Sequence, residues 1–165
     1  MLWGFWNENE PEADMIRTSA TQMAHPDLEA LFDSLLPFTK KLLNEQGGFN
    51  PWAAAMSSTG EIRWICAHNG EEFPEAQALI DMLTETFHRQ SPRGVLRAIG
   101  ICYDARVRPP GQSDNSDAIC CSLEHVSGEA LDVILPYTKA ADGIRYAETF
   151  TLIRDPKFFQ PTGTQ

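Results

Sequence analysis

The chain has 165 residues, a net charge of −10 and 42 % hydrophobic residues, which suffices for the core of one domain. Acidic residues outnumber basic ones by 23 to 13, and no basic cluster is present, so binding to a phosphate backbone is disfavoured. No apolar run approaches the roughly 20 residues of a membrane span, and residues 1–14 do not resemble a signal peptide. We therefore expect a cytoplasmic protein with no nucleic-acid or membrane partner.

Residues 1–26 are interpreted as an N-terminal arm. They are polar and acidic except near the start, where Trp3 and Trp6 lie among other apolar residues. These side chains either pack onto the domain that follows or dock onto a second subunit, so both are candidate binding residues. Residues 27–159 are expected to form a single domain, and residues 160–165 a frayed tail.

Two helices are predicted from apolar residues at helical spacing. The first spans residues 27–46, with Asp27 as a suitable N-cap and a glycine pair after its end as a C-cap signal. Pro37 lacks an N–H and clashes with the preceding turn, so this segment should be one kinked helix or two short ones. The second helix spans residues 74–90 and begins at Pro74, which suits a first helical position.

Alternating apolar residues predict strands in the rest of the domain. Short turns join consecutive strands, so we expect antiparallel pairing. The element order is α-β-β-α-β-β-β-β, which predicts an α+β domain with a single antiparallel sheet of five to six strands and two main helices on one face. The predicted strands cover residues 49–57, 61–67, 96–107, 117–126, 131–137 and 144–153.

One predicted strand, DAICCSLEH at residues 117–125, concentrates cysteine, carboxylate and histidine side chains. Successive side chains of a strand alternate between faces, so Cys120 and Cys121 should point in opposite directions and cannot bind one metal ion together. Cys121 is assigned to the core face as a buried or half-buried thiol. Cys120 and Glu124 are assigned to an outward face, where Glu124 could pair with a basic residue of a neighbouring strand.

Four residues are the candidates for catalysis, namely Asp104, Glu124, His125 and Tyr137, arranged around the loop at residues 108–116. A polar loop beside the end of a sheet is a common location for a functional site. Strand alternation nevertheless predicts that Glu124 and His125 diverge.

A divalent cation could bind if adjacent strands brought Asp104, Glu124 and Asp132 together. These carboxylates equally fit the mixed charges of a solvated sheet face. The four cysteines lack zinc-ligand spacing, and no phosphate-binding glycine motif or nucleophile elbow is present. We therefore predict no metal site and no cofactor.

Trp52 follows an Asn-Pro pair that favours an extended or turn conformation. It either packs into the corner of a hairpin or forms the rim of a shallow pocket between helix and sheet. It is the third candidate binding residue.

Several short motifs follow one another between residues 28 and 159. They are GFNPWA (48–53), GEI (60–62), RAIGI (97–101), DAI (117–119), LEH (123–125) and LPY (135–137), together with Asp104 and Gly128. In this order they resemble a group of small bacterial proteins with no established activity. The element order also resembles profilin-like and roadblock-like domains. The resemblance implies an uncharacterised α+β domain and implies no reaction, cofactor or ligand.

These observations favour a non-enzymatic interaction domain that acts through a protein partner or through self-association, a homodimer being one such form. One alternative is a small hydrolase or ligand-binding enzyme with a carboxylate-lined site at a sheet end. Another is an immunity-like protein that neutralises a basic toxin, which the acidic surface would suit.

Overall fold

The computed structural model of the chain describes residues 16–17 and 25–159. Trp3, Trp6 and the predicted tail at 160–165 lie outside the described residues, as does most of the predicted arm. Within the described part, neither helix combines the length and the apolar character that crossing a membrane requires.

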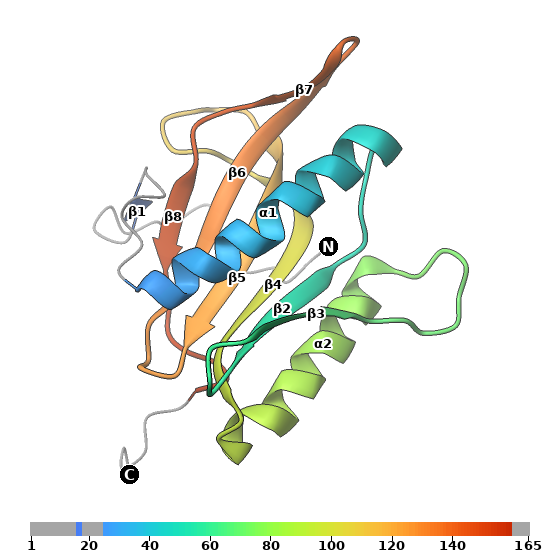
Figure 1. The fold of residues 1–165 in the computed structure, drawn as a ribbon. Helices are drawn as coiled ribbons and strands as arrows, with labels where there is room; N and C mark the ends of the chain where they lie inside the picture. The colour runs from blue at the N-terminus through green and yellow to red at the C-terminus, as the bar shows by residue number, and fades with distance from the viewer. Residues whose placement is uncertain (1–15, 18–24, 160–165) are drawn as a thin grey trace.

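The described chain is an α+β domain built on one antiparallel sheet, as predicted (Figure 1). The sheet has the strand order β1-β8-β6-β5-β4-β2-β3, with β7 paired to β6. It exceeds the predicted strand number because Ile16–Arg17 adds a strand and the predicted strand at 144–153 is divided in two. The helical elements are α1 (Pro26–Gln46), α2 (Ala76–Gln90) and the short 3₁₀ helix η3 (Ser91–Arg93). The strands are β1 (Ile16–Arg17), β2 (Trp52–Ser57), β3 (Ile62–Cys66), β4 (Leu96–Val107), β5 (Ser116–His125), β6 (Ala130–Ala140), β7 (Gly143–Tyr146) and β8 (Phe150–Ile153).

The two main helices cover opposite faces of the sheet, and the prediction that both lie on one face is wrong. In β2, Ala54 packs in the same core as Leu35 of α1, whereas its neighbour Ala53 packs in a second core with Ile80 of α2. Consecutive strand residues face opposite ways, so these two cores lie on the two sides of the sheet. The central strands are apolar on both faces, and both faces must therefore be covered.

Helix α1 is one continuous helix with Pro37 inside it. The missing N–H of Pro37 leaves the carbonyl of Asp33 without its helical partner, and both residues are exposed, so water can satisfy that carbonyl. The N-cap is His25 rather than Asp27, because Pro26 already occupies the first turn. The Nδ1 atom of His25 accepts the N–H of Asp27 at 3.1 Å.

The segment after β8 completes the core on the α2 face. Phe158 and Phe159 are buried there with residues of α2, and the ring of Phe158 meets that of Phe87 edge-on at 6.0 Å. This segment also covers the end of β5, which brings backbone N–H groups to Glu124.

Candidate functional site

The four predicted catalytic residues lie in three separate places. Asp104 and Tyr137 come together on the α1 face, where the hydroxyl of Tyr137 donates to Oδ1 of Asp104 at 2.9 Å. Burial raises the pKa of Asp104, although the hydrogen bond from Tyr137 opposes this. Burial, followed by the charge of Asp104, also raises the pKa of Tyr137. Neither Glu124 nor His125 joins this pair.

Glu124 lies on the opposite face in a buried hydrogen-bond network. Its carboxylate is 0 % exposed and accepts the backbone N–H groups of residues 157–159 at 2.8, 2.6 and 2.7 Å. Arg154 donates from Nη1 to Glu124 at 3.0 Å, from Nε to Asp132 at 3.1 Å and from Nη2 to Ser122 at 2.9 Å. Each oxygen of this carboxylate therefore accepts two hydrogen bonds. Its role is structural, because it binds the C-terminal segment to the sheet.

This arrangement corrects two expectations from the sequence. The face of β5 that carries Cys120 and Glu124 is buried rather than outward, because α2 and residues 154–159 cover it. Asp104 lies on the other face from Glu124 and Asp132, so the predicted cluster of three carboxylates does not form. The partner of Glu124 is Arg154, which lies 30 residues away in the chain.

The cysteines of β5 point to opposite faces, as predicted, and both are fully buried. Burial raises the pKa of Cys120, and the Sγ atom donates to the hydroxyl of Tyr103 at 3.2 Å. The contact of Cys121 with Cys102, 3.5 Å between sulfur atoms, together with burial, raises the pKa of Cys121. Neither thiol is placed to act as a nucleophile.

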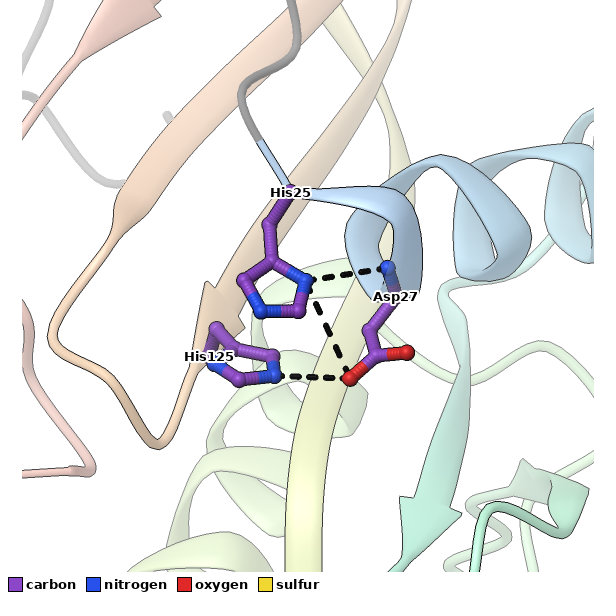
Figure 2. A group of neighbouring side chains, drawn as sticks. All are labelled: His25, Asp27 and His125. Carbon is purple, nitrogen blue, oxygen red and sulfur yellow. Dashed lines mark hydrogen bonds and ion pairs between the residues drawn. The ribbon is translucent and has the colours of Figure 1, made fainter.

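His125 belongs to a third group, formed where β5 ends beside the start of α1 (Figure 2). Its Nε2 lies 2.8 Å from Oδ2 of Asp27, and its Nδ1 accepts the N–H of Ser127 at 3.0 Å. The ring of His25 stacks on that of His125 with centroids 3.7 Å apart, and Nδ1 of His25 lies 3.8 Å from the same oxygen of Asp27. Arg97 approaches this oxygen with Nε at 3.0 Å.

The hydrogen bonds of His125 and Asp27 determine which of their atoms carry a proton. Because Nδ1 of His125 accepts a hydrogen bond, its Nε2 carries the proton and donates it to Asp27. The hydrogen bond from His125 and the charge of Arg97 lower the pKa of Asp27 against the opposing effect of burial. The carboxylate is therefore ionised at neutral pH and joins the helix start to the end of β5.

Replacing Asp27 with Asn is expected to lower the free energy of unfolding by about 1–2 kcal/mol at neutral pH, because a charge-assisted hydrogen bond at a helix start is lost. A lowered carboxyl pKa stabilises the fold above the unfolded-state value of about 3.9, and this contribution disappears as the pH falls through the folded-state value. Urea unfolding of both chains from neutral pH to about pH 3 measures the difference. A difference that stays constant over this range would contradict the assignment.

Trp52 is buried, so it does not form the exposed rim that the sequence left open. Its Nε1 donates to the hydroxyl of Thr39 at 2.9 Å, and its ring meets that of Trp64 edge-on at 5.2 Å. The exposed aromatic residues here are Trp64 of β3 and Phe38 of α1, 55 % and 36 % exposed, which stack at 5.3 Å. Sequence reasoning missed both as surface residues, because their apolar spacing fits a core position equally well.

Sequence reasoning also left His25, Asp27 and Arg97 out of the candidate site. The His-x-Asp spacing at residues 25–27 was the only local signal, and nothing in it points to His125. Comparison of the chain with protein-family models, with curated proteins and with solved structures gave no match, so the function must be inferred from the geometry.

Proposed function

We propose that this chain is a protein-interaction domain that self-associates through the free edge of β3. The observation that supports this is that β3 is the last strand of the sheet and carries the exposed ring of Trp64. None of the described strands pairs with its outer edge. An unpaired strand edge is a template for pairing with another chain.

The hydrogen-bond register of β3 places main-chain groups along this edge. Ser57 donates to the carbonyl of Glu61 at 2.8 Å, so Glu61 faces β2. Along an antiparallel strand, the main-chain N–H and C=O groups of successive residues point alternately to the two sides of the strand. The main-chain groups of Ile62, Trp64 and Cys66 therefore point away from β2. A second copy could accept and donate hydrogen bonds at these three positions.

The aromatic cluster beside the edge is held in place before any partner arrives. Nε1 of Trp64 donates to the hydroxyl of Ser34 at 2.8 Å, and Trp52 and Phe38 contact its ring on two sides. Preordered aromatic residues are frequent anchors of interfaces, because binding then costs little side-chain entropy. Ile62, 36 % exposed, extends the apolar surface along β3.

The charges of β3 favour one antiparallel register between two copies. If the twofold axis passes midway between the Ile62 residues of the two copies, Glu61 of each copy lies opposite Arg63 of the other. A shift of one residue along each strand would instead place Arg63 opposite itself. Opposite charges on paired strands stabilise and like charges destabilise, so the first register is preferred.

Two other functions that the sequence left open have less support. An enzyme built from Asp104, Glu124, His125 and Tyr137 is disfavoured by their separation into three places. An immunity-like role rests only on the small size of the chain and its net charge of −10. The resemblance to profilin-like and roadblock-like domains is a resemblance of element order only. It therefore suggests no ligand for this chain.

The test is the oligomeric state of the full chain, measured by sedimentation velocity over a range of concentrations. We expect a monomer–dimer equilibrium. Glu61→Lys should weaken it at least about tenfold, because two like-charge contacts replace two attractive ones. The double change Glu61→Lys with Arg63→Glu restores the pairing and should recover the dimer.

A matched control is Glu85→Lys on α2, where Glu85 also forms an exposed pair with a neighbouring arginine. This variant should dimerise like the wild type. Ile62→Pro removes only the outward N–H of Ile62 and should abolish pairing while the thermal unfolding midpoint changes little. A chain that stays monomeric, or a dimer that tolerates Ile62→Pro, overturns the proposal.

A further inference from the structure

The group formed by His25, Asp27 and His125 is independent of the β3 edge, and we propose that it binds a divalent metal ion of the zinc class. One ligand atom from each of the three residues lies within 4.8 Å of the other two. In a tetrahedral zinc site with bonds of about 2.0–2.1 Å, ligand atoms lie about 3.3 Å apart. The two histidine rings are stacked with 27° between their planes, so they would have to rotate until a nitrogen lone pair of each pointed at one ion, while the ligand atoms moved about 1 Å closer together.

The donor set selects the kind of metal. Two imidazole nitrogens and one carboxylate oxygen suit Zn²⁺, Co²⁺ and Fe²⁺, whereas Mg²⁺ and Ca²⁺ prefer oxygen donors throughout. Three protein ligands leave a fourth position open. The side chains of His25 and Asp27 are 28 % and 21 % exposed, so an ion could enter from the solvent and that position would face it.

Metal binding requires a rearrangement of protons that can be stated atom by atom. In the metal-free form, Nε2 of His125 carries a proton and shares it with Asp27, while Nδ1 accepts the N–H of Ser127. An ion bound at Nε2 displaces that proton to Nδ1, so the ring stays neutral and no proton leaves it. The N–H of Ser127 then loses its acceptor, and the turn after β5 must adjust.

Metal binding at Nδ1 of His25 also breaks a hydrogen bond, because this atom accepts the N–H of Asp27. Each lost hydrogen bond lowers the affinity by about five- to tenfold. Affinity should therefore be in the micromolar range, well below that of a closed structural zinc site. Zinc binding should also perturb the backbone amide signal of Ser127.

Arg97 is expected to oppose metal binding, so its replacement should raise the affinity for zinc. Its Nε lies 3.0 Å from the oxygen of Asp27 that faces both histidines. This guanidinium and a divalent cation compete for the same carboxylate and repel each other. Arg97→Gln should therefore bind zinc several-fold more tightly than the wild type, although it removes a native ion pair.

The experiment is a calorimetric titration of the tag-free full chain with Zn²⁺, with the visible absorption of Co²⁺ as a second readout. We expect one ion per chain. His25→Gln and Asp27→Asn should each weaken binding at least about tenfold, because one of three ligands is lost. Circular dichroism confirms that each variant is folded, and His25→Gln keeps the test informative if His125→Gln, at a buried position, does not fold.

Matched controls come from the other exposed ligand-type residues. His88→Gln and the double change Cys66→Ser with His68→Gln should leave zinc affinity unchanged. The proposal is overturned by an absence of stoichiometric zinc, by zinc binding that only the Cys66 and His68 changes remove, or by unchanged affinity in both His25→Gln and Asp27→Asn. Unchanged or weaker binding by Arg97→Gln contradicts the placement of the carboxylate in the site.

Discussion

Replacing Arg154 with Met is expected to destabilise the fold by about 3–5 kcal/mol, because removing one partner of a buried ion pair leaves uncompensated charge. The guanidinium lies between the carboxylates of Glu124 and Asp132, whose side chains are 0 % and 7 % exposed, and is itself 16 % exposed. Methionine fills a similar volume without a charge. The carboxylates of Glu124 and Asp132 would then lie buried without the positive charge that pairs with both of them.

Urea unfolding measures this change, and Arg145→Met is the matched control. Arg145 contacts Asp142, but both side chains are more than two-thirds exposed, and the loss of such a pair costs less than about 1 kcal/mol. Equal effects of the two substitutions would contradict the role of Arg154. Because the backbone of residues 157–159 depends on the same carboxylate, Arg154→Met should also speed amide exchange at Phe158 and Phe159.

The second large effect concerns the packing of Leu35 of α1 against Gly100 of β4. Leu35→Ala should cost about 2–5 kcal/mol, since Leu35 is 0 % exposed and its removal leaves a cavity. Gly100→Ala should cost about 1–3 kcal/mol by overpacking. A Cβ atom at Gly100 would come within 2.9 Å of Cδ1 of Leu35 and 2.8 Å of Cδ2 of Leu123.

The two substitutions are expected to compensate each other in part. In the double variant, the methyl group added at position 100 enters space that Leu35 has vacated. The loss of unfolding free energy should therefore be smaller than the sum of the single losses by about 1 kcal/mol. A double-mutant cycle from urea unfolding provides the measurement, and strict additivity would show that the two positions do not share this space.

Much of the fold could be predicted from neighbouring residues. The spacing of leucines along 27–46 and the glycines after it predicted α1 to within a residue. Alternation in residues 117–125 correctly separated Cys120 from Cys121. Such signals are local, because helix and strand periods place residues relative to their own backbone and need no information about the rest of the chain.

The side of the sheet that each helix covers could not be predicted in the same way. The residues of β2 are apolar throughout most of its length, which fits a strand buried on both faces as well as a strand buried on one. Only the crossover that carries α2 behind β2 and β4 distinguishes these arrangements. Glu124 was misplaced for the same reason, since its partner Arg154 comes from a segment beyond β8.

Local sequence patterns were enough to establish the α+β class, the approximate element boundaries, the antiparallel pairing and the burial of Cys121, but not the burial of Cys120, which was expected on an outward face. Which polar groups meet depended on the tertiary structure. His125 finds Asp27 across 98 residues, and Trp64 becomes an exposed edge residue only because β3 is the last strand of the sheet. Local periodicity orients a side chain relative to its own strand or helix. Contacts between distant segments depend on how those elements pack, and both proposed sites are formed by such contacts.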